Sequence, residues 1–145
     1  ILDLPKTVEV LETLGVSMVG FKTSEFPSFY SRSSGIKRVT RVDSVKKISE
    51  VFLNNRFLET LGATLVLNPT PAESEIPIEI MDPIIHSAIA KLNKRGIEGK
   101  MVTPFLLSYI HEKTEGRSLG ANISLALNNI QLGSKIAKSL NAKEG

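Results

Sequence analysis

The alternation of strand-like and helix-like segments constrains the fold of this chain more than any other feature of its sequence. Ser17–Phe21 and Thr64–Asn68 are short apolar runs typical of buried strands, and Arg38–Val42 alternates like a short strand. Segments with helical periodicity lie between and after these runs. Strands separated by helices predict a layered α/β fold with mostly parallel strands. About three strands make a thin sheet for a free-standing domain of this class.

The helical segments are delimited by caps, prolines and glycines. We expect a first helix that begins at Pro5 and ends before Gly15, and a second that begins at Asp43 or Ser44. A third should begin between Pro77 and Pro83 and end at Gly96. A fourth should begin at Thr103 and Pro104 and end near Gly116, and a fifth should run from Ser118 to about Leu140. Four of these helices have side chains that we expect to point inward. They are Val8, Leu11 and Leu14 in the first helix; Val45, Ile48, Phe52 and, at its end, Phe57 in the second; Ile84, Ile85, Ala88, Ile89 and Leu92 in the third; and Leu119, Ile123, Ala126, Leu127, Ile130 and Ala137 in the last. Residues 44–60 and 118–140 are apolar over more than a narrow stripe, which suits burial on two sides.

Length and composition limit the class of protein. The 145 residues correspond to about one domain, and 41% hydrophobic with 23% charged residues supports an ordinary core. The net charge is +3, but the scattered cations favour a solvated helix surface over a nucleic-acid interface. The absence of cysteine excludes disulfides and thiolate metal sites and fits a cytoplasmic protein. No apolar run reaches membrane-spanning length, and no signal peptide is visible. The sequence opens on Ile1 rather than Met, in the middle of a sequence pattern, so we expect it to be a fragment.

A segment rich in aromatic residues and serines, Thr23–Gly35, stands between two apolar runs and reads TSEFPSFYSRSSG. Its Ser, Pro and Gly residues break both periodicities, which predicts a structured loop. Its three aromatic side chains could fasten a long loop to the core, or they could lie over a functional site. Arg32 could grip a phosphate with two parallel N–H donors, although arginines are often simply exposed.

Other candidate residues give weaker signals. The sequence has no glycine-rich dinucleotide or phosphate-binding motif. His86 and His111 stand alone, without a partner at metal-ligand spacing. Acidic residues gather before the third helix, where the helix dipole favours them, at Glu73, Glu75, Glu79 and Asp82. Asn122 falls early in the last helix, where a buried amide would need hydrogen-bond partners.

Several separated blocks resemble the pseudouridine-5'-phosphate glycosidase family, also called the indigoidine synthase A-like family. The blocks read ILDLP at 1–5, LETLGV at 11–16, GFKTSEFPSFYSRSSG at 20–35, RVDS at 41–44, NPTP at 68–71, GKMVTPFLL at 99–107 and SLGANISLALNN at 118–129. They occur in order over nearly the whole chain. The resemblance implies that the chain is the C-terminal portion of a three-layer α/β/α fold, with residues 1–145 belonging to a single domain whose N-terminal half is missing.

The resemblance also implies a reaction. Enzymes of this family reversibly split pseudouridine 5'-phosphate into uracil and ribose 5-phosphate. The bond that breaks joins two carbons, so it offers no leaving oxygen or nitrogen to protonate, as ordinary glycosidases require. The family instead uses an imine between a lysine and C1 of the ring-opened sugar as an electron sink. Such a lysine must lose its proton, which calls for partial burial or neighbouring cations.

Most of the family's catalytic residues are expected outside this chain. The resemblance places the imine-forming lysine a couple of residues before Ile1. The acid/base glutamate, a phosphate-binding lysine and a manganese-binding aspartate belong to the N-terminal half, so no manganese ligand is expected here. Lys6 and Lys22 do not occupy the lysine position of the motif. Asn122 matches the family's active-site asparagine and is the site residue that the resemblance assigns to this chain, for substrate orientation.

Two functions from different classes follow from these observations. In the first, the chain is part of a glycosidase that binds small-molecule substrates, forms a homotrimer and needs its other half, so the isolated chain is inactive. In the second, it is a non-catalytic half-domain that acts in oligomerisation or interaction through an exposed sheet edge. A Gly-x-Lys-Ser sequence directly before Ile1 would favour the enzyme. Neither function involves nucleic acid or a membrane.

Overall fold

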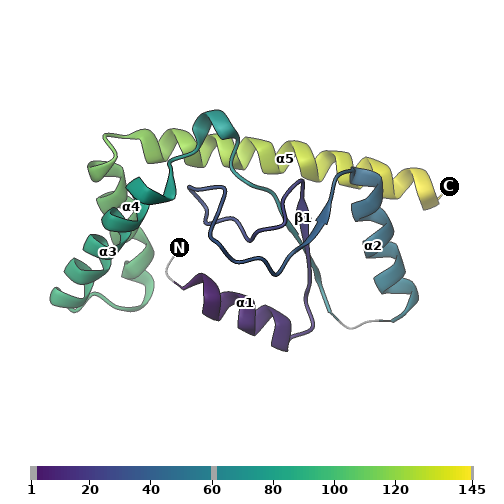
Figure 1. Ribbon diagram of the computed structural model, residues 1–145, viewed down its shortest axis with the longest axis horizontal. Coiled ribbons are helices and arrows are strands. Elements are labelled where there is room, and N and C mark those ends of the chain that lie inside the picture. The colour runs from purple at the N-terminus through teal and green to yellow at the C-terminus, as the bar shows by residue number, and fades with distance from the viewer. Residues whose placement is uncertain (1–2, 60–61, 145) are drawn as a thin grey trace.

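The computed structural model describes residues 3–59 and 62–144 (Figure 1). The elements follow the order α1 (Leu4–Thr13), β1 (Ser17–Phe21), β2 (Thr40–Val42), α2 (Val45–Phe57), β3 (Thr64–Leu67), the short 3-10 turn η1 (Ala72–Ser74), α3 (Ile78–Lys94), a second such turn η2 (Gly99–Met101), α4 (Val102–Lys113) and α5 (Arg117–Glu144). The predicted α/β class is confirmed. None of the helices in the described ranges combines the length and apolarity that a membrane span needs.

The three strands form one parallel sheet in the order β2-β1-β3. Val19 of the central strand is paired with Thr40 on one side and with Val66 on the other. Consecutive side chains of β1 enter different clusters. Val19 packs with Ile48 of α2 and Leu132 of α5, whereas Met18 packs in the cluster that contains Val8 of α1. The sheet is therefore the middle of three layers, with α1 on one face and α2 and α5 on the other.

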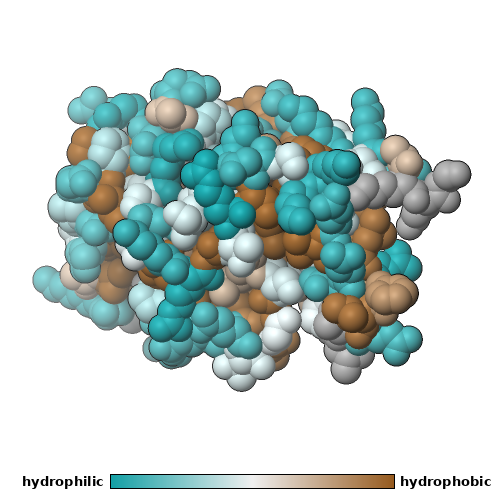
Figure 2. Space-filling view, turned by 45° about the vertical axis from the view of Figure 1, so that its right-hand side comes forward, coloured by the Kyte–Doolittle hydropathy of each residue, from teal (hydrophilic) through white to brown (hydrophobic). Residues whose placement is uncertain are grey.

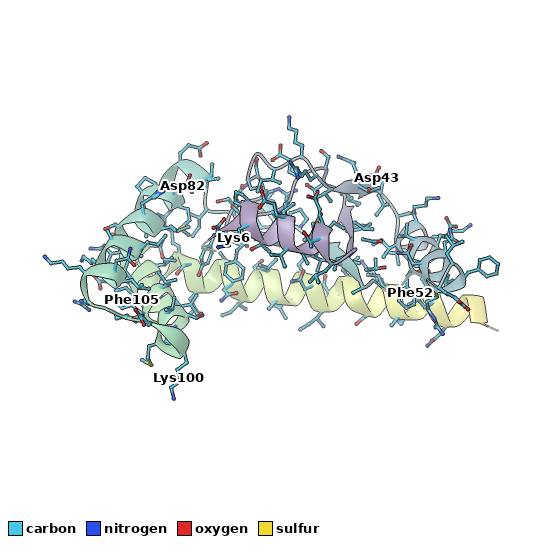
Figure 3. All side chains as sticks on the ribbon, turned by 90° about the horizontal axis from the view of Figure 1, so that it is seen from below. Lys6, Asp43, Phe52, Asp82, Lys100 and Phe105 are labelled. Carbon is cyan, nitrogen blue, oxygen red and sulfur yellow. The ribbon has the colours of Figure 1, made fainter. Side chains whose placement is uncertain are left out.

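Helix α5 runs the length of the molecule and joins its two ends (Figure 3). At one end lie α3 and α4, on which Asp82 and Phe105 are labelled, and at the other lies α2 with Phe52. Buried Ala121 belongs to the cluster formed with α3 and α4, and buried Leu132 belongs to the cluster beneath the sheet. Helix α5 thus contributes side chains to separate clusters of the core.

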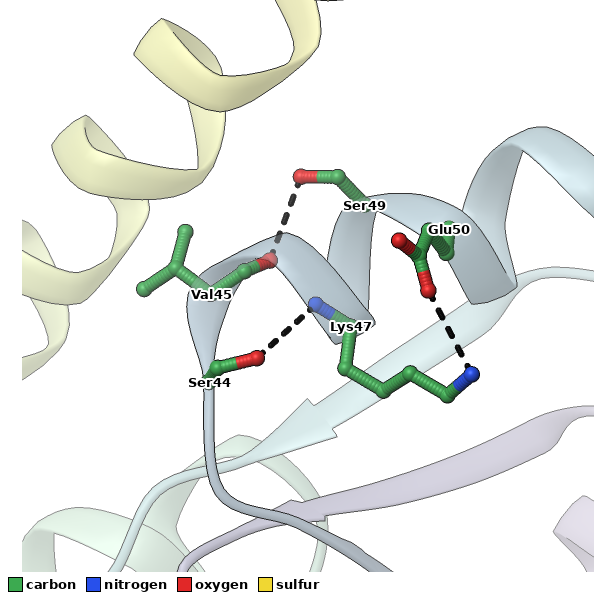
Figure 4. Close-up of polar contacts among 5 residues, drawn as sticks. All are labelled: Ser44, Val45, Lys47, Ser49 and Glu50. Carbon is green, nitrogen blue, oxygen red and sulfur yellow. Dashed lines mark hydrogen bonds and ion pairs between the residues drawn. The ribbon is translucent and has the colours of Figure 1, made fainter.

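Local sequence signals explain where the first two helices begin. The carboxylate of Asp3 accepts the Lys6 amide N–H at 3.0 Å and caps α1, and Pro5 occupies the first turn as predicted. At α2 the cap is Ser44 rather than Asp43, since the Ser44 hydroxyl accepts the Lys47 amide N–H at 3.2 Å (Figure 4).

Removal of the α2 cap should lower stability measurably. Ser44→Ala leaves the Lys47 amide without its acceptor, so we expect the free energy of unfolding to fall by about 1 kcal/mol. Urea unfolding of the complete gene product that contains this chain measures the loss. Ser24→Ala, in the exposed part of the 23–35 loop, is the matched control and should change nothing. Equal unfolding midpoints for the two variants would contradict the capping role.

The predicted start of α4 is wrong, because the helix begins slightly earlier in the chain. Thr103 was expected to cap the helix, but α4 begins at Val102 and continues directly from η2. Pro104 therefore lies inside the first turn, where its missing N–H has no carbonyl partner to lose. The pattern of Thr followed by Pro marked the right turn but could not show that a 3-10 turn precedes it.

The predicted inward face of α5 is also wrong. The core side chains are Ala121, Leu125 and Leu132, whereas the six predicted ones are exposed. Four of them form a continuous row that we call the α5 stripe: Leu119, Ile123, Leu127 and Ile130, exposed by 53, 54, 55 and 64%. Because the helix is apolar on two faces, periodicity alone could not select the one that meets the sheet. Leu14 and Phe57, also predicted inward, are 67 and 86% exposed at the ends of their helices.

Candidate functional site

The carboxyl ends of β1 and β3 open onto the same region of the molecule. In parallel α/β sheets, ligands characteristically bind beyond this edge. The chain turns sharply after β1: a Cβ on Gly20 would lie 2.2 Å from the carbonyl oxygen of Thr23, so only glycine fits there. After β3 the chain continues through Asn68 to Pro71. Asn68 is among the lining residues of two hollows.

Hydrogen bonds from serines hold the loop of residues 23–35 over this edge. The Ser31 hydroxyl donates to the Ile76 carbonyl oxygen at 2.6 Å, and the Ser34 hydroxyl donates to the Phe26 carbonyl oxygen at 2.5 Å. Hydrogen bonds from the Ser33 hydroxyl and the Gly35 amide hold the pKa of Glu25 below its usual value. The loop is therefore an ordered part of the domain.

The aromatic residues of the loop divide between core and site. Phe26 and Tyr30 are buried, which confirms the packing interpretation for these two. Phe29 is half-buried, meets the Tyr30 ring edge-on at 4.7 Å between centroids, and lines a hollow together with Phe26. Its backbone has φ +68°, in the left-handed region that bulky residues rarely adopt.

The first hollow, which we call the aromatic–amide pocket, has a volume of about 270 Å³. Its lining residues are Leu4, Phe26, Pro27, Phe29, Val66, Leu67, Asn68, Thr70, Leu125 and Asn129. The Asn68 side-chain amide donates to the Asn129 side-chain oxygen at 3.0 Å. The pocket thus combines apolar walls with a pair of uncharged amides.

The second hollow, which we call the polar pocket, has a volume of about 490 Å³. Its lining residues are Phe21, Lys22, Arg32, Asn68, Pro69, Pro71, Glu73, Ser124, Leu127, Asn128 and Gln131. The Asn128 side-chain amide donates to the Pro69 carbonyl oxygen at 3.1 Å, which ties α5 to the strand end. Lys22 has φ +58°, a second backbone outlier beside the site.

Arg32 lies at the polar pocket but is also part of the scaffold. Its guanidinium donates to the Thr70 carbonyl oxygen at 2.5 Å, and its amide N–H donates to the Glu75 carboxylate at 2.8 Å. The phosphate-binding interpretation of Arg32 stays a prediction. Among the acidic residues predicted near α3, Glu79 lies in the first turn, as the helix dipole favours.

Asn122 is half-buried near the start of α5. It lies one helical turn before Leu125 and two turns before Asn129, on the side of α5 that reaches the aromatic–amide pocket. It is not among the residues that line either pocket, and its predicted role remains to be tested. Lys6 lies on α1, Lys22 lies directly after β1, and both side chains are exposed.

The candidate metal ligands do not converge. Over residues 3–59 and 62–144 there is no group of three or more His, Cys, Asp or Glu side chains able to hold a metal ion. His86 and His111 are both exposed, and the Nδ1 of His86 lies 2.9 Å from the Asp82 carbonyl oxygen. The manganese predicted for the complete enzyme therefore finds no ligand set among these residues, and its site remains a prediction.

Sequence reasoning missed the amide-bearing residues Asn68, Asn128, Asn129 and Gln131. A signal was present for Asn68, because it directly follows a buried strand in a predicted parallel sheet. A further hollow of about 580 Å³ lies between α1 and α4, away from the strand ends.

These observations define a parallel α/β protein with a candidate small-molecule site beyond the carboxyl edge of its sheet. The chain belongs to the family described as indigoidine synthase A like protein, whose model matches residues 1–139. Pseudouridine-5'-phosphate glycosidases are similar to it, with 44% identity over 141 residues for the protein from Staphylococcus aureus and 47% over 140 residues for that from Paracoccus denitrificans. Each comparison covers 97% of this chain and 46% of the relative, so the chain spans about half the length of these curated relatives.

Two solved structures share the fold. The prealnumycin C-glycosynthase AlnA, in complex with ribulose 5-phosphate, superposes with a TM-score of 0.89 at 25% identity, covering 98% of this chain and 47% of that one. An indigoidine synthase A-like protein from Thermotoga maritima gives a TM-score of 0.83 at 37% identity, covering 97% and 46%.

Proposed function

We propose that this chain forms the C-terminal part of a glycosidase that reversibly cleaves pseudouridine 5'-phosphate into uracil and ribose 5-phosphate. The observation that carries the proposal is the similarity of nearly the whole chain to proteins named for this activity. A structural neighbour that holds ribulose 5-phosphate supports a sugar phosphate as ligand of this fold. The pockets at the strand ends supply a place for such a ligand beside α5.

The proposed chemistry requires a lysine that this chain does not offer in the motif position. The lysine amine would bond to C1 of the sugar as the ring C1–O bond breaks, and the ring oxygen would become a hydroxyl by taking up the proton that the amine loses. The nitrogen lone pair would then form the imine as the C–C bond breaks, and the uracil carbon would take up a proton. Water would release ribose 5-phosphate from the imine. Within this scheme the described residues bind and orient the substrate. No step is assigned to manganese, because these residues provide no ligand set for it.

The activity is tested on the complete gene product that contains this chain. Incubation with pseudouridine 5'-phosphate should release uracil, and uracil with ribose 5-phosphate should give the reverse reaction, both followed by chromatography. A protein that does neither, under conditions in which the Staphylococcus aureus relative is active, would contradict the proposed function.

Asn122 is proposed to orient the substrate, because its amide can donate and accept hydrogen bonds without adding charge. Asn122→Ala should therefore lower turnover at least about tenfold, since a substrate group left unsatisfied costs roughly 1–3 kcal/mol. The melting temperature should stay close to that of the unchanged protein. Asn141→Ala, at an exposed position of the same helix, is the control. Unchanged turnover, or a loss that follows the melting temperature, would favour a packing role for Asn122.

The complete protein is proposed to assemble as a homotrimer. The α5 stripe supports association, because a row of exposed leucine and isoleucine side chains is typical of a surface that another polypeptide covers. Figure 2 shows that apolar side chains also gather near the middle of one face. The same surface would serve a non-catalytic interaction module, which the activity measurement above distinguishes from an enzyme.

A further inference from the structure

We propose that a second anion-binding site, separate from the pockets at the strand ends, lies on the surface shared by α3 and α4 and binds a phosphate group. Its residues, which we call the tyrosine–lysine cluster, are Ser87 and Lys91 of α3 and Tyr109 and Lys113 of α4. None of the four lines the aromatic–amide pocket or the polar pocket, so the inference does not depend on the proposed reaction. Three features carry it: the charge of this end of the molecule, the pair of lysines, and the pair of hydroxyl groups.

The end of the molecule formed by α3 and α4 is basic. From Lys91 to Lys113 the sequence has five lysine or arginine residues and two glutamates, so this stretch alone accounts for the net charge of +3 of the whole chain. Arg95 adds a cation beside the cluster, because its guanidinium lies 5.6 Å from the centroid of the Phe105 ring. Figure 3 shows Phe105 at this end of the molecule. A surface with this excess of positive charge attracts anions from solution.

Two lysines from different helices meet at one aromatic ring. The Lys91 ammonium lies 4.8 Å and the Lys113 ammonium 5.8 Å from the centroid of the Tyr109 ring, and two like charges so placed repel each other. Within the described part of the chain Lys91 forms no ion pair with a carboxylate. Lys113 pairs with Glu112 at 3.4 Å, but both side chains are exposed, so this pair neutralises little charge. The cluster therefore keeps positive charge that an anion near both ammonium groups would neutralise.

The hydroxyl groups of the cluster supply a further donor. The Oγ of Ser87 and the Oη of Tyr109 lie 2.8 Å apart and share one hydrogen bond. Two hydroxyl groups have two protons, and the bond between them uses one. No other acceptor for either hydroxyl is found among the residues that the structure describes. One O–H is therefore left to donate to a ligand.

The phenol of Tyr109 shows that the surroundings favour negative charge. The hydrogen bond with Ser87 holds the pKa of Tyr109 below its usual value, and the positive charges of Lys91 and Lys113 act in the same direction. Burial opposes this shift without cancelling it. Groups that stabilise a phenolate oxygen also stabilise the oxygen of an anion bound beside it.

The donors of the cluster suit a phosphate group better than a carboxylate. A phosphate group carries a charge of about −1.5 to −2 near pH 7 and has three acceptor oxygens. The two ammonium groups match this charge, and together with the O–H they match the oxygens in number. Lysine commonly binds phosphate, because its ammonium is a compact charge with three donors. Inorganic phosphate and the phosphate end of a sugar phosphate present this same chemistry.

NMR of the complete gene product, labelled with 13C in its tyrosine rings, tests the site. Tyr109→Phe identifies the Tyr109 signal through its loss. We expect this signal to shift saturably when inorganic phosphate or ribose 5-phosphate is added, and to stay in place with sodium chloride at the same ionic strength. Equal half-saturating concentrations of the two ligands would show that the site reads the phosphate group alone. A lower value for ribose 5-phosphate would show that the sugar also contacts the protein.

Lysine variants connect the shift to the cluster. Lys91→Gln and Lys113→Gln should each raise the half-saturating phosphate concentration about fivefold, because each removes one ammonium group from an exposed site. Lys46→Gln removes the same charge from α2, at the opposite end of the molecule, and should have no effect. All three lysines are exposed, so the variants should fold normally. The site is overturned if phosphate leaves the Tyr109 signal in place, if sodium chloride shifts it equally, or if neither cluster variant weakens binding.

Discussion

Borohydride reduction in the presence of ribose 5-phosphate should leave the isolated 145-residue chain without a sugar-phosphate adduct. The full-length Staphylococcus aureus relative, treated in parallel, should gain one. An imine forms from a neutral amine, which a lysine provides when it is partly buried or flanked by cations. Lys6 and Lys22 are both exposed, and the Lys22 ammonium lies 5.3 Å from the centroid of the Phe21 ring. Intact mass spectrometry decides the result.

The same experiment can contradict the interpretation. An adduct located on Lys6 or Lys22 by peptide mapping would show that this chain carries its own nucleophile. Lys22→Arg and Lys6→Arg would then identify which amine reacts, because an arginine keeps the charge but forms no such imine. Turnover of pseudouridine 5'-phosphate by the isolated chain would have the same meaning.

Charges placed on the α5 stripe should have opposite effects in two settings. In the complete gene product, Ile123→Asp with Leu127→Asp should abolish the proposed trimer, because unpaired carboxylates would be buried in an apolar contact. In the isolated chain, which we expect to aggregate, the same pair should increase solubility, because the row of apolar side chains is interrupted. Size-exclusion chromatography with light scattering measures both.

The control for the stripe adds the same two charges elsewhere. Ala90→Asp with Asn141→Asp changes exposed positions of α3 and α5, and should leave both the trimer and the aggregation unchanged. A complete protein that keeps its mass after the stripe is charged would show that the stripe takes no part in assembly. A stable, cooperative monomer formed by the isolated chain would contradict the expectation that this chain needs a covering surface.

Much of the fold could be predicted because its elements are encoded locally. The predicted bounds of β1, Ser17–Phe21, agree with the structure, and Pro5 and Gly15 mark the two ends of α1. These signals depend on neighbouring residues only. The inward face of α5 could not be predicted in this way, since Leu125 and Leu127 are equally apolar and only the sheet determines which is buried. Phe57 shows the same limit at the end of α2.

The site was predicted less well than the fold, for a physical reason. Asn68 and Asn129 are 61 positions apart and line one pocket only when the end of β3 meets α5. No spacing rule connects two such residues, and asparagine is common in loops and on surfaces. The 23–35 loop was recognised as unusual, yet its serines proved to hold the loop together, as with Ser31 and Ile76.

The length of α5 has a consequence for how this protein can change. Its 28 residues extend over about 42 Å without a break. Insertion of one residue between Leu125 and Asn128 would turn everything beyond it by about 100°. The amides of Asn128 and Asn129 would leave their partners, and Leu132 would rotate out of the core in the same event. Single substitutions along this helix can be absorbed locally, but a change in its length would alter pocket, core and outer surface together, so natural length variation should fall at its two ends.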